Sequence, residues 1–91
     1  MTEIQVQVIN ELGLHLRAAA RFVDTASHFP CRVLVSTVGP AVDGKSLLAL
    51  SSLLARRGTT LVICCEGSGE VEAAQALHDL VASGFPGTSP R

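Results

Sequence analysis

Residues Gly13-Leu14-His15-Leu16-Arg17 begin the stretch GLHLRAAARFVDTASHFP, which runs to Pro30 and decides the first half of the fold. Its apolar residues recur every three or four positions, as on the buried face of an amphipathic helix: Ala19, Phe22, Val23, Ala26 and Phe29. We therefore expect a helix near residues 16–28. His15 then lies at its amino end, where backbone N–H groups lack partners within the helix and the helix dipole is positive. An anionic group on His15 would be stabilised there.

His15 and Arg17 together have the chemistry that a phosphoryl carrier needs. An imidazole nitrogen is a competent nucleophile near neutral pH and can form a covalent intermediate. The Arg17 guanidinium can stabilise the charge on a phosphoryl group during its transfer. In phosphoryl transfer, positioning and electrostatics supply most of the catalysis. The alternative interpretation is structural: His15 caps the helix, and Arg17 is a solvated surface charge.

Outside this helix, the chain alternates short apolar segments with turn residues. We expect strands near 3–9, 32–37, 40–43 and 60–66, a short helix from 47, and a last helix near 70–83 that ends at Gly84. This order, β-α-β-β-α-β-α, predicts an α+β fold: an open-faced β-sandwich in which three helices cover one face of a four-stranded antiparallel sheet. The 91 residues form a single domain, with an ordered core over about 3–84 and a frayed tail over 85–91.

The composition excludes several classes of partner. Seven basic and eight acidic residues give a near-neutral chain with no electrostatic attraction for nucleic acid. The amino terminus lacks a basic region and an apolar secretory core. The longest apolar stretch, 47–55, is far shorter than the roughly 20 residues that a membrane-spanning helix needs. We therefore expect a cytoplasmic protein with no membrane insertion and no nucleic-acid partner.

The cysteines and the other histidines predict neither disulfides nor a metal site. An odd number of cysteines without a signal peptide is typical of reduced thiols in the cytoplasm. Cys64 and Cys65 are consecutive in an expected strand, so one should face the core and the other the opposite side. His28 and His78 have no cysteine or histidine at ligand spacing, so we expect both on helix surfaces.

Further motifs accompany the His15 segment at matching spacing. They are RAAARFV over 17–23, VDGKSLL over 42–48, and a closing helix after a glycine-rich turn. From about residue 4 to about residue 84, the chain resembles HPr, the histidine-containing phosphocarrier family of the bacterial phosphoenolpyruvate-dependent phosphotransferase system. The resemblance implies the same open-faced sandwich. It also implies a phosphoryl-relay carrier and not an enzyme, with no cofactor and no metal.

The resemblance also implies roles for individual residues. His15 matches the histidine that accepts a phosphoryl group from phosphorylated enzyme I and passes it to a IIA-type protein, and the family favours the ring nitrogen nearer the backbone. Arg17 matches the arginine that assists binding and transfer. Ser46 matches a serine that a dedicated HPr kinase/phosphorylase modifies in many members. From the residues alone, the favoured interpretation is that Ser46 is the N-cap of the helix that begins at Leu47, and the resemblance brings the two roles nearer to even.

The chain departs from the family pattern near both motifs. Leu16 and Ala18 stand where relatives have a small or hydroxyl residue and a proline, so the first helical turn should be less rigid. Ala49 and Leu54 stand where relatives have glycines. Because both favour helix, we expect the helix from residue 47 to run longer than in relatives. None of these changes removes a chemical group, so they bear on partner choice and rate.

An apolar docking patch beside the histidine is the expected partner surface. Leu47 and Leu48 are consecutive, so a helix cannot bury both equally. The expected members are Leu16, Leu47 and Leu48, ringed by Arg17, Arg21 and Lys45. An apolar patch with a polar rim commonly marks a protein interface. The alternative is that these are ordinary surface leucines.

Two other functions share the expected layout. An RNA-binding module needs aromatic side chains on the sheet, whereas we expect Phe22, Phe29 and Phe85 in helices or in the tail. A regulatory protein-binding module, such as a nitrogen-branch HPr that acts on metabolic or transcriptional partners, stays open, because the sequence does not separate it from the sugar-uptake branch. For either branch of the family we expect a monomer.

Overall fold

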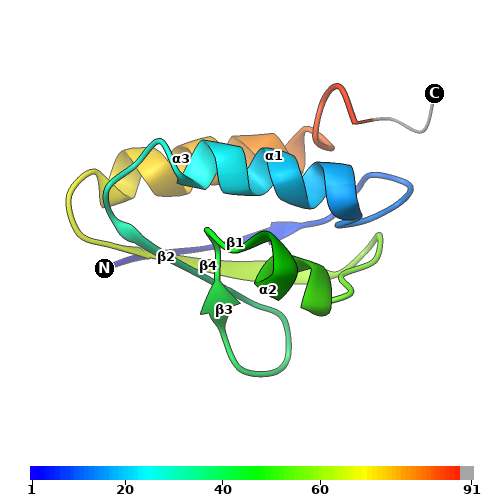
Figure 1. The fold of residues 1–91 in the computed structure, drawn as a ribbon, viewed down its shortest axis with the longest axis horizontal. Helices are drawn as coiled ribbons and strands as arrows, with labels where there is room; N and C mark the ends of the chain where they lie inside the picture. Colours follow the sequence, from blue (N-terminus) through cyan, green and yellow to red (C-terminus); the bar gives the residue numbers. More distant parts are fainter. Residues whose placement is uncertain (89–91) are drawn as a thin grey trace.

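The structure, a computed structural model, describes residues 1–88. The elements are β1 (Thr2–Gln7), α1 (Leu16–Ala26), β2 (Arg32–Ser36), β3 (Val42–Asp43), α2 (Leu47–Ser52), β4 (Thr60–Glu66) and α3 (Glu70–Ala82). The predicted fold class is confirmed: the strands form one open antiparallel sheet, and the three helices pack against one face of it (Figure 1). Within residues 1–88, no helix has the length and apolar content needed to cross a bilayer.

Strand β4 lies inside the sheet, whose order is β1-β4-β2-β3. It pairs with β1 on one side and with β2 on the other. Leu61, Ile63 and Cys65 of β4 are buried, whereas Val62 and Cys64 are partly exposed. Since successive side chains of a strand point to opposite faces, this alternation confirms that one of the two consecutive cysteines faces the core and the other does not.

The core lies between the sheet and the helices. Each helix contributes a fully buried side chain: Phe22 from α1, Leu50 from α2 and Leu77 from α3. Burial of a side chain of this size stabilises a fold by roughly 1.5–3 kcal/mol. The cysteines of the chain are all free, so the packed core, and no disulfide, holds the elements together.

Helix α2 does not extend to Leu54. It ends at Ser52, Leu53 is its C-cap, and Leu54 has a φ of +51°, in the left-handed region. The expected lengthening at Leu54 is therefore wrong. The chain turns here so that the Ala55 carbonyl can accept the Leu14 N–H at 2.8 Å, and this tertiary contact outweighs the preference of leucine for helix.

The expected frayed tail is wrong at its beginning. Gly84 has a φ of +79° and ends α3, as predicted. The Phe85 N–H donates to the Leu80 carbonyl at 3.0 Å, as in a Schellman motif. This reversal returns the Phe85 ring to the core, where it is 0% exposed, and Thr88 is buried as well. The packed part of the chain therefore extends past residue 84, while residues 89–91 of the expected tail lie outside the described residues.

Candidate functional site

His15 is the N-cap of α1. Its backbone is extended, with φ −73° and ψ 177°, and its carbonyl accepts the Ala19 N–H at 2.8 Å. Its side-chain Nδ1 accepts the Arg17 N–H at 3.2 Å. The imidazole is therefore held over the first turn of the helix, at the positive end of the dipole. The prediction that His15 lies at the amino end of this helix is confirmed.

A tight loop positions His15 from the other side. Gly13 has a φ of +66°, and a Cβ there would lie 2.5 Å from the Ala55 carbonyl oxygen. The Asn10 side-chain amide donates to the Gly13 carbonyl at 2.6 Å. The Leu14 N–H donates to the Ala55 carbonyl at 2.8 Å. Glycine is therefore required at position 13 both for its backbone angle and for the close approach of residues 55–56.

The two ring nitrogens of His15 differ in their surroundings. Because Nδ1 accepts a backbone N–H, its lone pair points at the start of the helix, and the proton of the neutral ring lies on Nε2. Nε2 is buried and has no hydrogen-bond partner within residues 1–88. Nε2 is thus shielded from an incoming reagent. Nδ1 lies beside backbone N–H groups, which can bind an anionic group attached to this nitrogen.

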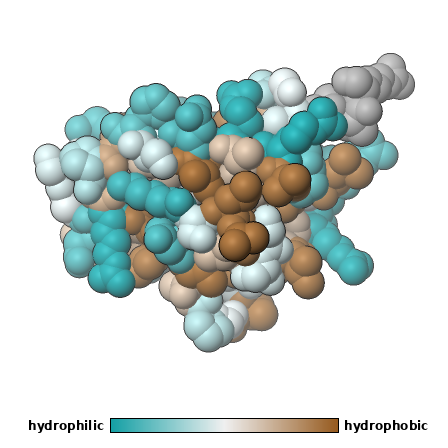
Figure 2. Space-filling view, in the orientation of Figure 1, coloured by the Kyte–Doolittle hydropathy of each residue, from teal (hydrophilic) through white to brown (hydrophobic). Residues whose placement is uncertain are grey.

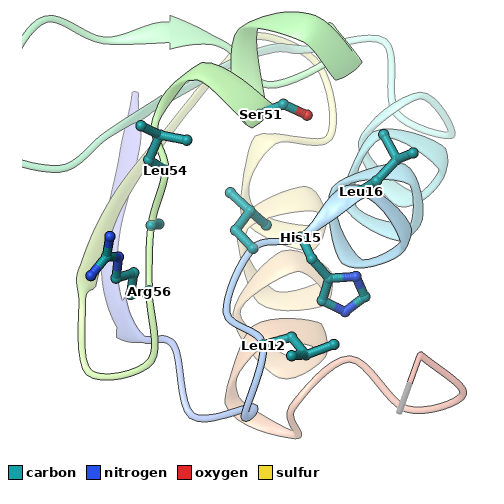
Figure 3. Close-up of a pocket in the computed structure, with 8 residues that line it drawn as sticks. Leu12, His15, Leu16, Ser51, Leu54 and Arg56 are labelled. Atoms are coloured by element: carbon teal, nitrogen blue, oxygen red, sulfur yellow. The ribbon is translucent and has the colours of Figure 1, made fainter. Parts of the chain in front are cut away.

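A pocket of about 460 Å³ opens beside His15 (Figure 3). Its lining residues come from two segments: Leu12, Leu14, His15 and Leu16 from the start of α1, and Ser51, Leu54, Ala55 and Arg56 from the end of α2. In Figure 3, Arg56 lies across the pocket from His15, and its guanidinium points away from the imidazole. Nothing in the sequence indicates that Leu12, Ser51, Leu54 and Arg56 belong to one site, because only the tertiary fold brings the two segments together.

Figure 2 shows an apolar patch on the surface over α1 and α2, with hydrophilic residues around it. Leu16 is 66% exposed and Leu48 is 85% exposed, whereas Leu47 is partly buried and packs against the core. This confirms that one of the two consecutive leucines is exposed. Whether the surface binds a partner stays a prediction.

The cations expected around the docking patch have different partners. The Arg21 Nη1 donates to the Pro86 carbonyl at 2.8 Å, and the Lys45 Nζ donates to the Phe29 carbonyl at 2.6 Å. Both side chains therefore hold parts of the fold together, which the sequence did not predict. Arg17 is exposed in the first turn of α1, next to His15.

Ser46 is the N-cap of α2, as its position predicts. Its Oγ accepts the Ala49 N–H at 3.2 Å, and its backbone is extended, with φ −114° and ψ 116°. The side chain is partly exposed. The capping interpretation is confirmed, and phosphorylation of Ser46 stays a prediction.

Two of the three thiols have a raised pKa. Burial raises the pKa of Cys65 to about 11, and burial followed by a hydrogen bond to Glu3 raises the pKa of Cys64. Thiols with a raised pKa carry little thiolate at neutral pH and react slowly. Residues 1–88 also bring together no group of three or more side chains that could hold a metal ion.

Comparisons with known proteins agree with this geometry. The family model described as the PTS HPr component phosphorylation site matches residues 2–83. The phosphocarrier protein HPr of Pseudomonas aeruginosa is 44% identical over 86 residues, which cover 93% of this chain and 96% of the relative. A crystal structure of HPr-C-His from Thermoanaerobacter tengcongensis matches with a TM-score of 0.90 at 39% identity, over 93% of this chain and 96% of that one. A crystal structure of an HPr dimer from the same organism matches with a TM-score of 0.74 at 39% identity, over 93% of this chain and 98% of that one.

Proposed function

This chain belongs to the HPr family of phosphocarrier proteins of the phosphotransferase system, and we propose that it accepts a phosphoryl group on His15 from phosphorylated enzyme I and passes it to a IIA-type protein. The observation that carries this proposal is the His15 side chain, which caps α1 and whose Nδ1 lies against the Arg17 N–H. A carrier of this kind forms a covalent phosphohistidine but emerges unchanged from each cycle.

Nδ1 is the acceptor atom in this proposal. Its lone pair attacks the phosphorus atom of the donor phosphohistidine, in line with the donor's phosphorus–nitrogen bond. As the new bond forms, the old one breaks and its electron pair returns to the donor nitrogen, while the His15 proton stays on Nε2. Transfer to the IIA-type acceptor is the same reaction in reverse. The burial of Nε2 supports this assignment.

The helix start and Arg17 stabilise the transferred group. Once phosphorus occupies Nδ1, the N–H groups of Leu16 and Arg17 turn to the phosphoryl oxygens, which are stronger acceptors because they are charged. The Arg17 guanidinium balances part of that charge, as positioned cations do in phosphoryl transfer. No metal or organic cofactor takes part on the carrier's side.

The remaining assignments follow from family membership. We assign the chain to the cytoplasm and expect it to act as a monomer, although a relative from T. tengcongensis has been crystallised as a dimer. A Ser-directed HPr kinase/phosphorylase is the expected regulator, acting on Ser46. Pull-down with sugar-permease components and with regulatory proteins of the nitrogen branch distinguishes a sugar-uptake role from a regulatory one.

Incubation with phosphoenolpyruvate and enzyme I, followed by intact mass measurement, tests the proposal. The wild-type chain should gain an acid-labile adduct of about 80 Da, the mass of one phosphoryl group. His15→Ala should gain none, whereas the matched variants His28→Ala and His78→Ala should gain it normally. ³¹P–¹⁵N correlation should place the phosphorus on Nδ1. A wild-type chain that stays unmodified, or a His15→Ala chain that is modified equally, contradicts the proposal.

A further inference from the structure

Leu54 combines a strained backbone with an exposed side chain. Within residues 1–88, two residues other than glycine have a positive φ: Leu54 at +51° and Phe85 at +54°. A residue with a Cβ is strained in this region. For Phe85, burial of the ring in the core offsets the strain, but the Leu54 side chain is 79% exposed. Stability of the fold therefore does not account for a leucine at position 54, and strain of this kind is typical of functional positions.

Leu54 lies at the mouth of the pocket beside His15. Leu12 and Leu16 line the same pocket, and all three side chains are more than half exposed (Figure 3). We call Leu12, Leu16 and Leu54 the leucine rim. Because His15 also lines this pocket, a protein that brings a phosphorus atom within bonding distance of the imidazole must also cover the leucine rim.

The pocket is large enough, and apolar enough, to take an apolar side chain. Its volume is about 460 Å³, and Leu14 and Ala55 add apolar walls below the leucine rim. Such a pocket typically receives an anchor side chain that becomes fully desolvated in a complex. A buried anchor also explains why a leucine is present at the mouth, since its exposed surface is removed from water only when the partner is bound.

The charges beside the pocket are placed unevenly. Among the residues within 1–88 that line the pocket, Arg56 is the one with a permanent charge. Arg57, which follows it in the sequence, is exposed. On the opposite side, Glu11 precedes Leu12 in the sequence. The side formed by residues 56–57 is therefore cationic, and a partner that presents a carboxylate to this side is favoured by charge complementarity.

We propose that the leucine rim receives one apolar side chain of the protein that exchanges phosphoryl groups with His15, and that Arg56 pairs with a carboxylate next to that side chain. Leu54 is thus a specificity-determining residue: it selects partners with a projecting apolar side chain at this position. The inference rests on the proposed phosphocarrier function and adds the chemistry of the surface that the partner must carry.

The variants Leu54→Gly and Leu54→Asn test the proposal, because both residues adopt a positive φ readily. Both variants should keep or raise the melting temperature, since the strain is relieved. Both should raise the KM for phosphoryl transfer from enzyme I about tenfold with kcat nearly unchanged, as expected when an interface anchor contact worth about 1.4 kcal/mol is lost. Arg56→Gln should raise the KM at low salt and have a smaller effect at high salt.

Val38→Gly is the matched control. Val38 is fully exposed in the turn between β2 and β3 and does not line the pocket, so its removal should leave the KM unchanged. An unchanged KM for Leu54→Gly, with His15 still phosphorylated, overturns the inference and leaves the proposed function intact. A wild-type dimer that Leu54→Gly dissociates, seen by sedimentation, overturns it in favour of a second copy. Absence of any phosphohistidine on the wild type is instead a failure of the proposed function.

Discussion

Gly13 and Leu54 both have a positive φ, and both belong to the loops that meet at His15. At Gly13 the residue type is forced, because the Ala55 carbonyl leaves no room for a Cβ. At Leu54 the backbone would favour glycine, yet the chain has a large apolar side chain. Gly13 therefore holds the loops of the site together, and Leu54 shapes the surface of the site.

Gly13→Ala should destabilise the fold and misplace His15. The alanine would be strained at φ +66°, a cost of about 1–3 kcal/mol, and its Cβ would collide with backbone atoms of Ala55 and Arg56. Denaturant unfolding measures the loss. Gly39→Ala is the matched control, because nothing lies within 4 Å of a Cβ at position 39. Equal stability of the two variants would show that the loop adapts without cost.

The three helices differ in how their amino ends are capped. His15 caps α1 with its imidazole, and Ser46 caps α2 with its hydroxyl. Gly69 precedes α3 in the left-handed conformation, and the Glu70 carboxylate accepts the Gly67 N–H at 3.2 Å. A side chain that caps a helix is already committed to a backbone N–H. When His15 or Ser46 is phosphorylated, the hydrogen bond between its side chain and the backbone N–H must therefore give way to the phosphate.

Ser46→Ala should lower the free energy of unfolding by about 1 kcal/mol, the usual contribution of an N-cap side chain. Ser46→Asp should retain most of the stability, because aspartate is an equally good N-cap. Thermal or denaturant unfolding measures both. Ser52→Ala serves as the control, since the Ser52 hydroxyl only donates to the Ala49 carbonyl at the other end of α2. A Ser46→Ala protein as stable as the wild type would argue that the hydroxyl is kept for modification alone.

Phe85→Ala should destabilise the fold by about 3–5 kcal/mol, the usual cost of removing a fully buried aromatic ring. The segment after α3 would then behave as the frayed tail that its composition suggests. Denaturant unfolding measures the change. Phe29→Ala should cost less, because Phe29 is only partly buried. A small effect of Phe85→Ala would mean that the segment after α3 contributes little to the core.

At the scale of the whole molecule, several acidic and basic side chains lie at opposite ends of the sheet, although Arg32 lies opposite Glu66 and Glu11 lies in the loop before α1. Glu3, Glu66, Glu70 and Glu72 lie at the end where β1 begins and β4 ends. Arg17, Arg56 and Arg57 lie at the opposite end, where α1 begins (Figure 1). A nearly neutral chain thus has a cationic end at the phosphoryl site, which favours the approach of an acidic partner surface.

Stability should fall in acid through Glu70. Hydrogen bonds from the Thr2 hydroxyl at 2.6 Å, from the Met1 amino group and from the Gly67 N–H lower the pKa of Glu70 from its ordinary value of 4.5 to about 2. The folded state therefore binds fewer protons than the unfolded state between these values, so the contribution of Glu70 is present above pH 4.5 and is lost as the pH falls towards 2.

Glu70→Gln should flatten the acid limb of the stability profile, measured by denaturant unfolding between pH 2 and pH 6. Glu72→Gln removes the same charge from the same helical turn and controls for the effect of the helix dipole. An acid limb of equal slope in Glu70→Gln and in the wild type would show that other carboxylates dominate the acid sensitivity.

The amino-acid sequence by itself determined the order of the elements, the fold class and the position of His15 at a helix start. These properties depend on local periodicity, on turn residues and on capping preferences, which act over a few neighbouring positions. The exposure of at least one of Leu47 and Leu48 and the opposite orientations of Cys64 and Cys65 followed in the same way from the periods of a helix and a strand.

The tertiary structure alone decided which of these residues meet. The Leu14–Ala55 hydrogen bond brings the loop before α1 against the end of α2, and so creates the pocket with Leu12, Leu54 and Arg56. It also decided that α2 stops at Ser52 and that Phe85 returns to the core. Contacts between distant segments override local propensity because they satisfy backbone groups and bury apolar surface, contributions larger than the few tenths of a kcal/mol by which propensities differ.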